Sequence, residues 1–128
     1  MIYLASPHWA PSKELREERA LAARSLTAHF LKLGSAVFSP INHNHWLGLD
    51  LDHAMWLDLD KQYLRHCSHI YVAQLPGWEN SKGIKIELAL AIDLCIMRID
   101  IGPKRLQEIL GDETWQRLYT LTRRDDLI

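Results

Sequence analysis

The first forty residues combine two short apolar runs with one helical pattern. Residues 2–6 are an apolar run that stops at Pro7, which predicts a buried first strand. Apolar side chains then recur at helical spacing over residues 12–33, and Gly34 stands where a left-handed C-terminal cap belongs. Residues 36–38 form a second apolar run. This order predicts a βαβ unit with parallel strands and a right-handed crossover.

Residues 41–75 predict a loop, a helix and a third strand. We expect a polar loop over residues 41–50, a helix over residues 51–67 and a strand over residues 70–75. The helix carries apolar side chains at i+4 steps, which predict its buried stripe: Met55, Leu59, Tyr63 and Cys67.

The last third of the chain predicts a third helix, a weaker strand and a helical tail. A loop over residues 76–82 leads through Gly83 into the third helix, and a fourth strand follows over residues 96–101. The tail, residues 103–119, predicts two short helices that are split at a glycine, with Asp112 as the N-cap of the second. The apolar side chains expected on the third helix are Leu88, Ala91, Ile92 and Cys95.

Together these elements predict one α/β domain spanning residues 1–128. We expect a doubly wound, Rossmann- or flavodoxin-like sheet of four to five mostly parallel strands with flanking helices. In such a sheet the ligand binds outside the carboxyl ends of the strands. The loops after Ser6, Phe38 and Leu75 should therefore surround one crevice.

Composition narrows the class of protein. The chain is 48% hydrophobic with a formal net charge of −1, so no basic field points to nucleic acid as a partner. Cys67 and Cys95 lie far apart without metal-ligand spacing, and a disulfide framework is not expected. No signal peptide or membrane-length apolar run is present, so we expect a cytoplasmic protein without a membrane partner.

Three residues are candidates for catalysis. Glu87 lies near the start of the third helix among apolar neighbours, where it could be a nucleophile or base, or a solvated carboxylate favoured by the helix dipole. Asp60 is either a catalytic acid or one of several acids on a wet helix face. Tyr3 is either a core aromatic or the hydrogen-bond partner of a carboxylate at the site.

Other residues are candidates for binding. Ser81 and Gly83 precede the third helix, where free N–H groups favour a phosphate, although Ser81 could also be an ordinary N-cap. His43, His45 and His53 lack a carboxylate partner at metal-ligand spacing, so we expect hydrogen bonding to a polar ligand rather than a metal site. Two further residues complete the expected binding set: Ser6 at the end of the first strand and Trp78 in the loop over residues 76–82.

Four segments resemble the nucleoside 2-deoxyribosyltransferase superfamily, and its small bacterial and phage members most closely. They are the opening IYLASP, the segment VFSPINHNH, Asp60 before the third strand, and LPGWENSKGIKIELALA. The last is the most specific, since it resembles the family's small residue, Gly and Glu leading into an Ala-rich helix. The resemblance extends from residue 1 to about residue 101.

The resemblance implies a role for each matched residue. Glu87 falls on the nucleophile that attacks the sugar C1′, Tyr3 on the tyrosine that orients it, and Asp60 on the acid that handles the departing base. Ser81 departs from the transferases, which usually have an Asp there, and is similar to the phosphate-binding serine of deoxynucleoside 5′-monophosphate N-hydrolases.

The expected function is cleavage of the base–sugar bond of 2′-deoxynucleosides or their 5′-monophosphates through a covalent intermediate on Glu87. Base exchange on the same intermediate and a catalytically silent nucleotide-binding module are the alternatives. No cofactor is expected. The resemblance also implies a homo-oligomer in which a neighbouring subunit closes the site.

Overall fold

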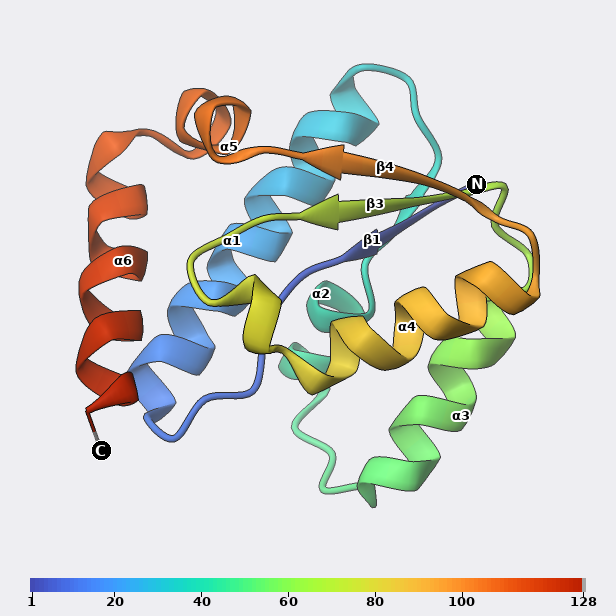
Figure 1. Ribbon diagram of the computed structural model, residues 1–128, viewed down its shortest axis with the longest axis horizontal. Coiled ribbons are helices and arrows are strands. Elements are labelled where there is room, and N and C mark those ends of the chain that lie inside the picture. The colour runs from blue at the N-terminus through green and yellow to red at the C-terminus, as the bar shows by residue number, and fades with distance from the viewer. Residues whose placement is uncertain (128) are drawn as a thin grey trace.

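Four short strands form one sheet in which every neighbouring pair is parallel (Figure 1). In this computed structural model, which describes residues 1–127, the sheet order is β2-β1-β3-β4. The strands are β1 (Ile2–Ala5), β2 (Val37–Phe38), β3 (His69–Ala73) and β4 (Met97–Ile101). Because the chain crosses from β2 to the other side of β1, the order switches between β1 and β3, as in a doubly wound sheet. The predicted fold class is confirmed.

Helices cover both faces of this sheet. They are α1 (Lys13–Lys32), α2 (Pro40–Asn44), α3 (His53–Leu64), α4 (Lys82–Asp93), α5 (Pro103–Leu110) and α6 (Asp112–Asp126), with 3-10 turns η1 (His45–Leu47) and η2 (Trp78–Asn80). Successive strand side chains point to opposite faces. Leu4 of β1 accordingly packs in a cluster with α1, α5 and α6, whereas Tyr3 and Ala5 pack in a second cluster with α3 and α4.

The polar loop expected over residues 41–50 is wrong in its first half. The Ser39 hydroxyl accepts a hydrogen bond from the Asn42 N–H, and Pro40 occupies the first turn of α2. A capping serine followed by proline starts a short helix even where the sequence is polar. The turn η1 then continues from α2, so this segment is folded rather than extended.

The two buried stripes predicted from helical spacing are in large part wrong. On α3, Met55, Leu59 and Tyr63 are exposed. On α4, Ile92 is 76% exposed, and Cys95 lies beyond the helix and is exposed. Each helix contains enough apolar residues for more than one stripe, so spacing alone did not select the inward face. The buried residues of α4 are Ile84, Glu87 and Ala91.

Several predicted bounds also differ from the structure. The helix expected over residues 51–67 is shorter in the structure, where α3 runs from His53 to Leu64. The strand expected over residues 70–75 begins at His69 and ends at Ala73. The third helix begins at Lys82, one residue before Gly83, because Ser81 caps it.

The tail packs on α1 and completes the core. Leu106, Leu118 and Leu121 are buried in the α1-side cluster. The expected N-cap at Asp112 is wrong, since Gly111 holds that position, and α6 extends past the predicted end at residue 119 to Asp126.

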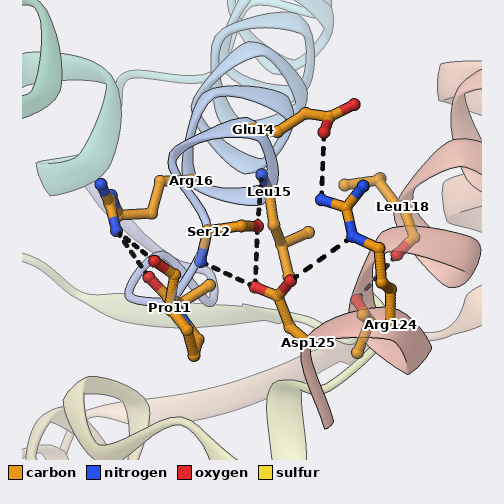
Figure 2. Close-up of polar contacts among 10 residues, drawn as sticks. Pro11, Ser12, Glu14, Leu15, Arg16, Leu118, Arg124 and Asp125 are labelled. Atoms are coloured by element: carbon orange, nitrogen blue, oxygen red, sulfur yellow. Dashed lines mark hydrogen bonds and ion pairs between the residues drawn. The ribbon is translucent and has the colours of Figure 1, made fainter. Parts of the chain in front are cut away.

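Polar contacts fix the end of α6 to the start of α1 (Figure 2). The Asp125 carboxylate accepts hydrogen bonds from the Ser12 N–H at 3.0 Å and from the Ser12 hydroxyl at 2.8 Å. Arg124 forms an ion pair with Glu14 at 3.0 Å. The tail is therefore part of the same folded unit as α1.

Candidate functional site

A tyrosine and a carboxylate meet beneath α4. The Tyr3 hydroxyl donates a hydrogen bond to Oε2 of Glu87, which joins the first strand to α4. Tyr3 is fully buried and Glu87 is 9% exposed. The interpretation of Glu87 as a solvated helix carboxylate is therefore wrong. A buried charged group requires a partner, and the phenol supplies one.

The position of Glu87 follows from helical geometry. Ile84, Glu87 and Ala91 are spaced three and four residues apart, so they lie along one face of α4. Ile84 and Ala91 pack in the apolar cluster with Tyr3 and Val72, and they hold Glu87 against the sheet.

Asp60 lies on the inner side of α3 and faces the same space. It is half-buried, and its Oδ1 accepts a hydrogen bond from the Asn44 amide of α2 at 3.3 Å. Asp60 is therefore not one of the fully solvated acids of its helix. Asn44 had no role in the sequence-based prediction. Its only signal was its place within the matched segment VFSPINHNH.

The three candidate catalytic residues line one small cavity between β1, α3 and α4. The remaining lining residues come from the two helices: Leu57, Lys61, Leu64, Ile86 and Leu90. Its volume is about 10 Å³, which is room for about one water molecule. Tyr3, Asp60 and Glu87 are thus brought together as predicted, in a site that is closed in this conformation.

Burial controls the ionisation of both carboxylates. It raises the pKa of Glu87 to about 8. The charge of Asp60 also raises this pKa, whereas the Tyr3 hydrogen bond lowers it. Burial also raises the pKa of Asp60 to about 6, against the lowering effects of the Asn44 hydrogen bond and of His43 and His53. The pKa of Tyr3 is raised far above its ordinary value, chiefly by burial and by Glu87, so the phenol remains a donor.

The N-terminus of α4 lies one turn from Glu87. The Ser81 hydroxyl accepts a hydrogen bond from the Ile84 N–H, so this serine is the helix N-cap. Gly83 and Glu87 are four residues apart and share a helix face, about 6 Å apart along the axis. A Cβ at Gly83 would come no nearer than 3.9 Å to the Ser81 hydroxyl, so local packing does not demand glycine there.

The predicted histidines separate into two places. His43 is exposed and lies beside Phe38 and Tyr63, with ring centroids 5.5 and 5.8 Å away. His45 instead contacts His8, with 2.9 Å between His45 Nδ1 and His8 Nε2. Within residues 1–127, no group of three or more His, Cys, Asp or Glu side chains is placed to hold a metal ion.

His8 and Ser6 follow β1 directly. Burial, aided by His45, Arg16 and Arg19, lowers the pKa of His8 to about 4, so its ring is neutral near pH 7. The Ser6 hydroxyl is buried without a hydrogen-bond partner among the described residues. The Ser6 hydroxyl and the His8 ring offer polar groups just after the first strand. Ser6, His43, His45, Ser81, Gly83 and Trp78 are not among the described residues that line the small cavity.

The tryptophans divide between packing and exposure. Trp78 is half-buried and packs against the core cluster of α3 and α4, which favours packing over stacking on a ligand. Trp9 is 75% exposed with the Arg16 guanidinium 5.0 Å from its ring.

Fold and site together define a doubly wound α/β domain with a buried, tyrosine-bonded glutamate and a second carboxylate facing one cavity. The chain belongs to the family described as a domain of unknown function (DUF1937), whose model matches residues 1–96. The match includes Tyr3, Asp60 and Glu87 and ends before β4. The comparison with curated proteins found no significant match. No helix within residues 1–127 combines the length and apolar character needed to cross a membrane.

Proposed function

We propose that this protein cleaves the N-glycosidic bond of 2′-deoxynucleosides or their 5′-monophosphates. The observation that carries the proposal is the buried Tyr3–Glu87 hydrogen bond with Asp60 facing the same cavity. A carboxylate held beside an acid is the arrangement that retaining glycoside cleavage requires. A protein that only binds nucleotides has no need of all three groups.

The proposed reaction has two steps. Tyr3 occupies Oε2 of Glu87, which leaves Oε1 as the attacking atom. As Oε1 bonds to the sugar C1′, the C1′–N bond breaks and the base leaves with a proton from Asp60. Water then attacks C1′, gives its proton to Asp60 and releases Glu87 with the free sugar in its original anomeric configuration. A second base in place of water would complete base exchange instead.

Substrate must open the cavity before this chemistry. A volume of about 10 Å³ holds no nucleoside, so α3 and α4 have to separate. Of the residues in α3 only Leu64 is buried, and weakly packed elements move at the lowest cost. We assign the opening motion to α3. Opening also hydrates Glu87, which lowers its pKa and favours the ionised nucleophile.

The binding roles extend this proposal. Gly83 and Ser81 place the N-terminus of α4 one turn from Glu87, where a 5′-phosphate would be favoured by the helix dipole. Ser6, His43 and His45 would contact the base or sugar once α3 has moved. No cofactor is required by this mechanism. The proposed setting is the cytoplasm, where Cys67 and Cys95 stay free thiols.

We also propose that a second subunit covers the opened site. The exposed apolar residues Met55 and Leu59 on the outer side of α3 would form that contact.

The test is release of free base from a panel of deoxynucleosides and their 5′-monophosphates, followed by chromatography. Wild type should release base, Glu87→Gln should lose at least about 100-fold, and Glu79→Gln, an exposed acid of the preceding turn, should match wild type. A 2-fluoro sugar analogue should label Glu87, as read by peptide mass spectrometry. Absence of both release and labelling, with or without an acceptor base, would leave only the nucleotide-binding alternative.

A further inference from the structure

The edge of the sheet formed by β4 has a defined hydrogen-bonding pattern. β4 is the last strand in the order β2-β1-β3-β4 and, within residues 1–127, pairs with β3 alone. The Ile101 carbonyl accepts from the Gln74 N–H, so Ile101 points its backbone groups toward β3. Because these directions alternate along a strand, the N–H and C=O groups of Arg98 and Asp100 point away from the sheet. Unpaired groups of this kind are a template for another strand.

Side chains on this edge alternate between charged and apolar faces. Arg98 and Asp100 share one face, and the Arg98 Nε lies 2.7 Å from Asp100 Oδ1. Met97 and Ile99 share the other face and are 60% and 39% exposed. β4 therefore combines outward hydrogen-bonding groups, opposite charges two residues apart and uncovered apolar side chains.

We propose that β4 pairs with β4 of a second copy of this chain, antiparallel and with the two-fold axis at Ile99. In this register Arg98 lies opposite Asp100 of the other copy, and Asp100 opposite its Arg98. Both residues have outward backbone groups, so each pair exchanges two backbone hydrogen bonds. The two Ile99 side chains meet at the axis as a non-hydrogen-bonded pair. The result is one continuous eight-stranded sheet.

The charges select this register over its neighbours. A shift of the axis to Arg98 or Asp100 would also pair outward backbone groups, but it would place like charges directly opposite one another, which is destabilising. An axis midway between two residues would place outward backbone N–H and C=O groups opposite residues whose groups point inward, so the two strands could not exchange hydrogen bonds. With the axis at Ile99, two arginines and two aspartates alternate across the interface. Such an isologous contact is closed and does not propagate.

This interface is independent of the proposed catalytic function. β3 separates β4 from Tyr3 in β1, so pairing at the edge leaves the cavity between α3 and α4 uncovered. It is also separate from the contact proposed for the outer side of α3.

Disulfide crosslinking tests the axis directly. In a Cys95→Ser background, which removes the exposed native thiol, Ile99→Cys should form an interchain disulfide under mild oxidation. Opposed residues of a non-hydrogen-bonded pair lie about 4.5 Å apart at Cα, within disulfide range. Met97→Cys is the matched control: it is more exposed, but its two copies would lie about 13 Å apart along the strands. Equal crosslinking of both variants, or of neither, would overturn the proposal.

A charge swap tests the pairing without cysteine. Arg98→Asp should weaken dimerisation at least about tenfold, because the new carboxylate faces Asp100 of the other copy. The double variant Arg98→Asp with Asp100→Arg should restore it, as measured by sedimentation velocity over a concentration series, with circular dichroism to verify folding. A wild-type monomer at every concentration, or a double variant as weak as the single one, would overturn the proposal and leave the edge to a different partner.

Discussion

Tyr3 and Glu87 lie 84 positions apart in the sequence, yet the phenol of one donates directly to the carboxylate of the other. The contact connects the second residue of β1 to the middle of α4 through the core between them. A carboxyl group in this environment is stabilised in its protonated form by burial and in its ionised form by the tyrosine. Because these two effects oppose each other, the pKa of Glu87 reports on the site and can be measured without knowing the substrate.

Replacing Glu87 by Gln should stabilise the fold at alkaline pH. The pKa of Glu87 is raised from an ordinary 4.5 to about 8, so between these values the folded protein holds a proton that the unfolded chain releases. Stability of the wild type should therefore fall as pH rises through this window, by on the order of a few kcal/mol. Glu87→Gln lacks this loss, and its melting temperature should exceed that of wild type increasingly from pH 5 to about 8.

The control for this comparison is Glu79→Gln. Glu79 is an exposed acid on η2, so its substitution should leave the shape of the wild-type curve unchanged. Thermal scans of the three proteins at half-unit pH steps supply the data. If wild type and Glu87→Gln gave parallel curves, Glu87 would not be the buried acid described here.

Removing the Tyr3 hydroxyl should raise the pKa of Glu87 further. The hydrogen bond favours the ionised carboxylate, so Tyr3→Phe leaves burial and the charge of Asp60 without this opposition. A ¹³C-detected titration of labelled glutamate side chains measures the change. If the pKa of Glu87 rose by about one pH unit, the hydrogen bond would favour the ionised carboxylate by about 1.4 kcal/mol.

Asp60→Asn is the opposing variant. The charge of Asp60 raises the pKa of Glu87, so its removal should move the Glu87 titration downward in the same experiment. If both variants shifted Glu87 in one direction, the two groups would not act on it as the structure indicates.

The sequence was sufficient to predict the sheet, and its family resemblance pointed to Tyr3, Asp60 and Glu87, which line one cavity. It did not predict which side of each helix faces them. Short apolar runs bounded by Pro and Gly locate the strands, because their length and flanking breakers favour a strand over a helix. α3 and α4 have apolar residues on several sides, and the predicted stripes included Met55 and Ile92, which are exposed. Only tertiary packing selects the inward face, and it selects the side of α4 that carries Glu87.

The binding residues were harder to predict because their contacts are not local. Asn44 reaches Asp60 through the short helix α2, which was expected to be a loop. Trp78 is in a turn, where exposure is the rule, yet it packs against the core because η2 folds back onto α4. Such contacts depend on the path of the chain between elements, which periodicity does not encode.

Gly77→Ala should be more destabilising than Gly34→Ala. Both glycines have positive φ, +87° and +88°, so both substitutions carry a similar backbone cost. A Cβ at Gly77 would also lie 2.7 Å from a guanidinium nitrogen of Arg19 and 3.0 Å from Thr122, whereas nothing lies within 4 Å of one at Gly34.

Arg19 cannot easily move away from such a Cβ. It is buried, and it donates hydrogen bonds to the Trp9 carbonyl at 2.9 Å and the Pro76 carbonyl at 3.2 Å. Losing one of these bonds should add about 1–3 kcal/mol to the cost of Gly77→Ala. Urea unfolding of Gly77→Ala and Gly34→Ala measures the difference in their free energies of unfolding. Equal losses of stability in the two variants would contradict a tight contact between a Cβ at Gly77 and Arg19.

The connection between α6 and α1 predicts a pH dependence of opposite sign to that of Glu87. Burial raises the pKa of Asp125, but the two hydrogen bonds from Ser12 and the charges of Arg124 and Arg19 outweigh it, and the pKa is lowered overall. A lowered pKa stabilises the fold above the ordinary value of 3.8, and this stability is lost as pH falls through the folded value.

Asp125→Asn should therefore cost about 1–3 kcal/mol at pH 7 and progressively less as pH falls below about 4 in urea unfolding. Asp126→Asn, at the exposed neighbouring position, should cost little at either pH. If the loss of stability in Asp125→Asn did not change with pH, the Asp125 contact with α1 would not depend on the charge of its carboxylate.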